Sequence, residues 1–205
     1  MINPNKLVRS DWSLYPPTSF PYGVAFAEWT RRWWRWLLTI PKNINPANDM
    51  TGEFISRSQN DPNVWFLAGT FGGSIERKCK IPFGKSILFP VINYEACFAD
   101  EPLLSDSVEL ENKCKAEIDK IGELYCYFDE QAVDLREYRI ASSGFEIALN
   151  YGNCLSAKAG KTIMASDGYW LFLSPPSHGK HEIKSFGSCL AGKIKIGCTF
   201  DIDII

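Results

Sequence analysis

The chain has 205 residues, a formal net charge of −2 and a pI near 5.8. Its hydrophobic content of 45% is enough to fill one core, whereas its length is short for two ordinary domains. Lys and Arg are not in excess, and phosphate binding needs clustered basic side chains, so nucleic acid is excluded as an expected partner. The sequence therefore predicts one globular domain.

The sequence contains no run of about 20 apolar residues, the length that a transmembrane helix needs. Its longest apolar run lies between Ser86 and Ile92, so we expect no membrane span. The first residues, Met1 to Asp11, lack the apolar centre of a signal peptide. We therefore expect no signal peptide in this chain.

Residues 1–21 are polar and contain several prolines, which predicts an extended arm laid over a domain formed by residues 22–205. Four of the seven tryptophans follow, between Tyr22 and Pro41. At about 100° per residue, one helical stripe collects the large apolar side chains of this segment. They are Phe26, Trp29, Trp33, Trp36, Leu37 and Ile40. We expect a helix that ends at Pro41 and packs on a sheet through this stripe.

Residues 42–63 are predicted to form a long ordered loop. Segments 64–73 and 74–82 then read as two strands joined by a Gly-Gly turn, and 86–93 as a strand that is buried on both faces or bulged at Pro90. Helical spacing returns in residues 105–121, where Gly122 is the expected C-terminal cap.

Short strands follow to the end of the chain, beginning near residues 124, 138, 145, 162, 169, 181 and 193. Roughly ten strands with no strand–helix–strand alternation favour a mainly β protein. We predict a single antiparallel, jelly-roll-like β-sandwich with two helices, of which the Trp-rich one packs on the sheet.

Several motifs along the chain resemble a family of mostly secreted bacterial and archaeal proteins that has no established activity. The matching stretches are Tyr22-Gly23 with Glu28-Trp29 and Trp33-Trp34-x-Trp36, Val64 to Ser74, Cys79 to Lys85, Phe89 to Asn93, Asp167 to Trp170, and Gly179-x-His181-x-Ile183. This resemblance implies a β-rich fold and an extracellular location. Members of the family carry a cysteine shortly after the position of Glu53, and this chain does not.

Seven cysteines are spread widely through the chain, without a CxxC pair, so a zinc ribbon or a thioredoxin-like motif is excluded. Cys97 follows a predicted strand and Cys114 lies in the next predicted helix. We expect these two to lie close enough to form a disulfide in an oxidising environment.

A metal site could use His178 and His181, but a third ligand would have to come from a distant carboxylate. We therefore expect no metal and no other cofactor. The candidate catalytic carboxylates are Glu28 on the Trp-rich helix, with Glu95 and Asp167 at predicted strand ends. Glu28 stands three and four residues before two arginines, so an ion pair competes with a catalytic role.

Trp34 lies off the buried stripe of the helix, and Trp170 lies in a late strand. Both are candidates for ligand binding, since flat aromatic faces stack on sugars. The sequence favours a non-enzymatic β-sandwich that binds a ligand, such as a glycan, or a protein partner, or that assembles with its own copies. The alternative is a glycan-acting hydrolase that uses two of the candidate carboxylates.

Overall fold

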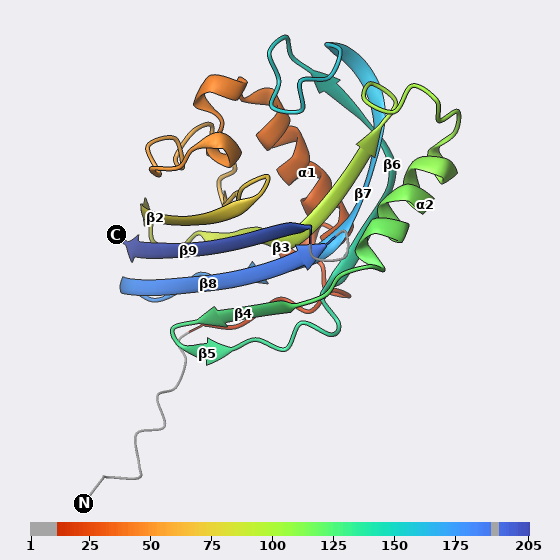
Figure 1. Cartoon of the computed structure of the whole chain (residues 1–205). Helices are drawn as coiled ribbons and strands as arrows, with labels where there is room; N and C mark the ends of the chain where they lie inside the picture. Colours follow the sequence, from red (N-terminus) through yellow and green to blue (C-terminus); the bar gives the residue numbers. More distant parts are fainter. Residues whose placement is uncertain (1–11, 190–192) are drawn as a thin grey trace, which may run out of the picture.

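The computed structural model describes residues 12–189 and 193–205. In chain order, the helices and strands within these residues are η1 Pro21–Gly23, α1 Phe26–Thr39, η2 Lys42–Ile44, η3 Pro46–Asn48, β1 Val64–Phe66, β2 Gly73–Ile81, β3 Ser86–Cys97, α2 Ser107–Ile118, β4 Leu124–Phe128, β5 Gln131–Ala132, β6 Arg139–Leu149, β7 Gly160–Leu173, β8 Gly179–Cys189 and β9 Ile194–Ile204. The fold is mainly β with two α-helices, which confirms the predicted class (Figure 1).

Two sheets are packed together. The first has the strand order β1-β3-β7-β6 and the second the order β2-β9-β8-β4-β5. Alternating apolar side chains of both sheets meet in a shared core, with Phe89 and Leu171 from the first sheet and Phe128, Ile183 and Phe200 from the second. This arrangement confirms the predicted β-sandwich.

The pairing of strands differs from the prediction in two places. β1 runs parallel to β3, and β2 runs parallel to β9, so the sandwich is not antiparallel throughout. β1 and β2 do not form the expected hairpin, because residues 67–72 carry the chain from one sheet to the other instead of turning it back.

Helix α1 covers the other face of the first sheet, and Figure 1 shows α1 and α2 on opposite sides of β3, β7 and β6. All six residues of the predicted apolar stripe are buried. Trp33 contacts Trp170 of β7 edge-to-face, with ring centroids 5.2 Å apart. Trp170 is 0% exposed, so its predicted role in ligand binding is wrong: its ring fills the core between α1 and the sheet.

β3 is buried on both faces over most of its length, and its register with β7 shifts between Pro90 and Ile92. Both alternatives predicted for this strand are therefore true. The bulge arises because Pro90 has no N–H to donate to a ladder. After the bulge, Asn93 and Glu95 face the side of α1, whereas Tyr94 and Ala96 face α2.

Helix α2 begins at a capping box, in which Asp106 accepts from the Glu109 backbone N–H and the Glu109 carboxylate accepts from the Asp106 N–H. Its buried residues Leu110 and Cys114 pack on Ala96 and Ala165. The helix ends at Ile118, before the predicted Gly122 cap.

All seven cysteines are free and buried. Cys97 belongs to the core beneath α1, whereas Cys114 belongs to the cluster beneath α2. The two side chains thus lie on opposite faces of the first sheet, and the predicted Cys97–Cys114 disulfide is wrong. Sequence proximity of the strand end and the helix does not reveal which face each side chain takes.

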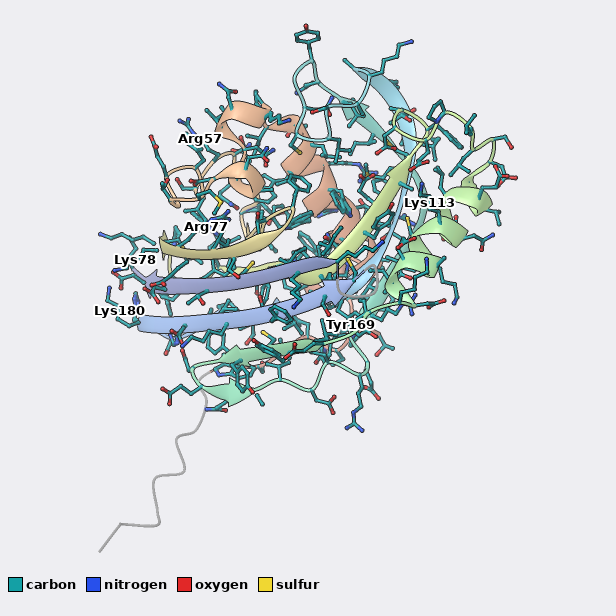
Figure 2. The ribbon with its side chains drawn as sticks, viewed as in Figure 1. Arg57, Arg77, Lys78, Lys113, Tyr169 and Lys180 are labelled. Carbon is teal, nitrogen blue, oxygen red and sulfur yellow. The ribbon has the colours of Figure 1, made fainter. Side chains whose placement is uncertain are left out.

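Arg77 is a buried charge on the inward face of β2, 1% exposed (Figure 2). Its guanidinium donates to the carbonyl oxygens of Ala68, at 2.7 Å, and of Asp49. The Asp49 carboxylate in turn accepts from the backbone N–H groups of Thr51, Gly52 and Phe54. Within the predicted long loop before β1, residues 49–54 are therefore held by Arg77 and by the Asp49 carboxylate.

Part of the predicted N-terminal arm lies outside the described residues. The described part lies along β7, where Leu14 bridges Leu173 and the Tyr15 N–H donates to the Phe172 carbonyl at 2.8 Å. Within the described part of the chain, no helix combines the length and the apolar character needed to cross a bilayer.

Candidate functional site

A pocket of about 240 Å³ lies between α1, the bulged part of β3 and the start of β9. We call it the Glu95 pocket. Apolar side chains form most of its wall, namely Trp33, Trp34, Leu37, Ala47, Phe71, Pro90, Val91, Ile92, Leu155, Ile194 and Ile196. Polar residues of β3 and of the loop that follows it complete the lining, namely Asn93, Tyr94, Glu95, Asp100 and Glu101, of which Tyr94 turns its side chain toward α2. A mainly apolar concavity with a few convergent polar groups is typical of a small-molecule site.

The carboxyl group of Glu95 is the buried acid of this pocket. Burial raises its pKa to about 8, and the charges of Asp100 and Glu101 add to the rise, while Lys113 opposes it. Its Oε2 atom is buried and has no hydrogen-bond partner among the described residues. These surroundings favour the protonated form of Glu95, whose buried oxygen has hydrogen-bonding capacity to spare.

Two buried N–H donors of pocket residues likewise lack a hydrogen-bond partner. Asn93 Nδ2 and Trp34 Nε1 are also without a partner in the described part of the chain. Trp34 is 3% exposed, so its ring is not part of the solvent-facing surface of α1. The ring lies off the apolar stripe, as predicted, but it faces the pocket because the loops on either side of it close over α1.

Gly168 of β7 brings β7 close to β3 beside this pocket. A Cβ atom at Gly168 would lie 2.6 Å from the Asn93 Cα atom, so only glycine allows this approach. Asp167, which was predicted at a strand end, lies with Gly168 in the middle of a 14-residue strand.

The mouth of the pocket carries Asp100 and Glu101. Asp100 is exposed, and its Oδ1 atom accepts from the Cys97 N–H at 3.0 Å. Glu101 forms an ion pair with Lys113, which reaches over from α2 (Figure 2). Asn93, Asp100 and Glu101 were not among the site residues predicted from the sequence. The i, i+2 spacing of Asn93 and Glu95 places both on one strand face and was the available signal.

Potential metal ligands meet at the same place, since the ligand atoms of Glu95, Cys97 and Asp100 lie within 4.8 Å of one another. Burial, together with the nearby Glu95 charge, raises the pKa of the Cys97 thiol to about 12. A metal would have to displace this proton from a sulfur atom packed in the apolar core. The cluster therefore suits hydrogen bonding better than metal binding.

Glu28 lies apart from the pocket, on the solvent side of α1. Its carboxylate is within 3.6 Å of Arg31 and 3.7 Å of Arg32, and it pairs with Arg35 at 3.0 Å. The ion-pair alternative for Glu28 is confirmed. These three arginines leave it without the apolar surroundings that would suit a catalytic acid.

Asp167 also has a structural role, because it forms an ion pair with an arginine. Its side chain is 4% exposed and pairs with Arg139 at 2.6 Å, and Arg139 joins Asp119 of the turn after α2 at 2.7 Å. Of the three predicted carboxylates, only Glu95 thus lies in the pocket. The other two bind neighbouring arginines.

The two histidines take separate structural roles. His178 stacks on Phe83, with ring centroids 4.0 Å apart. His181 contacts Asp129 through Nδ1, at 2.7 Å, and the Ser177 carbonyl through Nε2, at 3.0 Å. Both ring nitrogens of His181 are therefore already occupied by protein oxygens.

A larger and shallower hollow, of about 890 Å³, covers the outer face of β2, β9 and β8. Figure 2 shows Lys78 and Lys180 at this end of the second sheet. Lys180 pairs with Asp203 at 3.0 Å, and Lys78 lies opposite Asp201 in the ladder. The alternating charges are typical of a solvated sheet face, so the smaller Glu95 pocket is the better candidate site.

No protein-family model, curated protein or solved structure matches the chain. The site is therefore interpreted from its own geometry.

The buried acid gives a testable dependence of stability on pH. Unfolding lets Glu95 ionise near its ordinary pKa of 4.5, whereas the native state keeps the proton up to about pH 8. Between pH 4.5 and about pH 8, the native state thus binds more protons than the unfolded state. The contribution of Glu95 to stability is complete below about pH 4.5 and is lost as the pH rises toward 8. The slope is at most about 1.4 kcal/mol per pH unit.

Urea unfolding at about pH 5.5 and pH 7.5 measures this slope. The Glu95→Gln variant keeps the shape of the side chain but does not titrate, so it is expected to lose less stability than the wild type over this window. Equal losses in the two proteins would show that Glu95 is ionised in the native state.

Proposed function

We propose that this protein binds a small, oxygen-rich organic ligand, about the size of a monosaccharide, in the Glu95 pocket. One observation carries the proposal: Trp34, Asn93 and Glu95 line a single cavity, and each has a buried polar atom without a protein partner in the described residues. Each such atom costs about 1 to 3 kcal/mol when it is left unsatisfied. A ligand that supplies their partners recovers this free energy on binding.

The chemistry of these atoms describes the ligand. Trp34 Nε1 and Asn93 Nδ2 can only donate, so they call for acceptor oxygens on the ligand. The protonated Glu95 carboxyl can donate or accept. The volume of about 240 Å³ is just below the range of roughly 300 to 1,000 Å³ that suits drug-sized ligands. A ring or short chain with hydroxyl groups and an apolar face, such as a sugar, combines these features.

Two exposed phenylalanines provide a matched test. Phe71 is 47% exposed at the mouth of the pocket, whereas Phe83 is 56% exposed and lies outside it. Ligand-observed NMR with a panel of monosaccharides, amino sugars and polyols would identify a binder. Phe71→Ala is expected to weaken its binding about 2- to 10-fold through lost ring contacts, and Phe83→Ala to leave it unchanged. Binding that responds equally to both changes, or no binding by any panel member, would contradict the proposal.

Glycan hydrolysis is the second candidate function. Two observations favour it. The pKa of the Glu95 carboxyl is raised to about 8, and an oxygen of the Asp100 carboxylate lies within 4.8 Å of a Glu95 carboxyl oxygen. Retaining glycosidases hold their two carboxyl groups about 5 to 5.5 Å apart, one as acid and one as nucleophile. In this mechanism Glu95 protonates the leaving oxygen and Asp100 attacks the sugar carbon.

An assay with aryl glycosides separates the two functions. Turnover that Glu95→Gln abolishes and Glu28→Gln preserves, with circular dichroism unchanged, would establish the hydrolase. Binding without turnover would leave the protein as a binding protein. Assembly with its own copies stays a prediction from the sequence.

A further inference from the structure

The Glu95 pocket is surrounded by more acidic than basic groups. Glu101 and Lys113 form a pair at the mouth, so their charges largely cancel. Asp100 is exposed beside them, and its contact is the neutral N–H of Cys97. The charge of Asp100 is not answered by that pair, and the carboxyl group of Glu95 deeper in the pocket adds a second negative charge when it ionises. The pocket therefore has a field that attracts a cation.

A metal ion alone would leave the N–H donors of the pocket residues without a partner. The unpartnered N–H groups of Trp34 and Asn93 repel a cation and need acceptor atoms. The pocket volume of about 240 Å³ also exceeds what one ion fills. Both observations favour an organic cation that carries its own oxygens.

We propose that the ligand is a primary amine with hydroxyl groups on a short carbon skeleton, such as an amino sugar, whose ammonium group lies beside Glu95 and Asp100. Its hydroxyl oxygens accept from Trp34 and Asn93. This inference rests on the proposed function of the pocket and adds the charge of the ligand to it.

The walls and the buried acid support this arrangement. The rings of Trp33, Trp34 and Phe71 line the pocket, and aromatic faces attract ammonium groups. The positive charge of a bound ammonium group favours the ionised form of Glu95 and lowers its pKa, so the carboxyl releases its proton to solvent and becomes the counter-ion of the ligand.

Three sugars of similar shape test the charge requirement by calorimetry at about pH 6.5. Glucosamine is a cation under these conditions, whereas glucose and N-acetylglucosamine are neutral. We expect wild-type protein to bind glucosamine at least tenfold more tightly than either neutral sugar. Asp100→Asn and Glu95→Gln are each expected to reduce this preference severalfold. Glu28→Gln, which removes an acid outside the pocket, serves as the control and is expected to retain it.

The other outcomes are distinct. Equal affinity for all three sugars would overturn the amine and leave the proposed function standing. Failure of every panel member to bind would overturn both. A parallel titration with zinc and manganese chlorides addresses the inorganic cation. Binding of either metal that is lost in Cys97→Ser, with no binding of glucosamine, would overturn the organic ligand in favour of a metal.

Discussion

Replacement of Trp33 by alanine is expected to lower the free energy of unfolding by about 3 to 5 kcal/mol. Trp33 is 3% exposed at the centre of the α1 core, where its ring makes edge-to-face contacts with Trp34, Trp36 and Trp170. Its Nε1 atom also donates to the Leu67 carbonyl at 2.8 Å. Alanine would remove the apolar area, leave a cavity and deprive that carbonyl of its donor.

Urea unfolding followed by circular dichroism measures this loss. Arg35→Ala in the same helix is the control, because Arg35 forms a surface ion pair with Glu28. Its expected cost is below about 1 kcal/mol. An unfolding midpoint of Trp33→Ala that equals the wild-type value would disprove the assignment of this helix face to the core.

Replacement of Arg77 by methionine is expected to cost about 2 to 5 kcal/mol, although methionine is apolar and of similar length. The reason is that the carbonyl oxygens of Ala68 and Asp49 are left buried without their donor. Desolvation lowers the pKa of Arg77, while the charge of Asp49 opposes this effect. The loop of residues 49–54, which is attached to Arg77 through Asp49, should become more mobile.

Lys78→Met is the matched control, since Lys78 is the next residue of β2 and points to solvent (Figure 2). Its effect should stay within about 0.5 kcal/mol. Hydrogen exchange would report the loop directly, through faster exchange of the Thr51, Gly52 and Phe54 amides that bind Asp49. Unchanged exchange in Arg77→Met would show that the loop is held by other contacts.

The Glu95 pocket could be foreseen only in part. Glu95 and Trp34 were separate candidates, each with a local reason: one acid near a strand end, and one ring off a helical stripe. Asn93 gave only its i, i+2 spacing from Glu95, and Asp100 gave no signal, because an amide and an exposed carboxylate look ordinary until their neighbours are known. The arginines beside Glu28 are neighbours in the sequence, whereas only the fold places Arg139 beside Asp167 and an apolar pocket around Glu95.

The sequence by itself determined the features that depend on local periodicity and local chemistry. The Trp stripe specified α1 and its buried face, the helical spacing of residues 105–121 indicated α2, and alternation indicated strands such as β2. Such signals are carried by residues within a few positions of one another, so they can be read without the fold.

Tertiary structure alone decided which strands pair and which side chains meet. β1 and β2 join different sheets, and Cys97 and Cys114 lie on opposite faces of one sheet. Trp34 and Glu95 meet although 61 residues (95 − 34) separate them in the chain. Strand pairing and burial of this kind depend on contacts between residues that are distant in the chain. The free energy of these contacts comes from the whole core, so no single segment carries a pattern that predicts them.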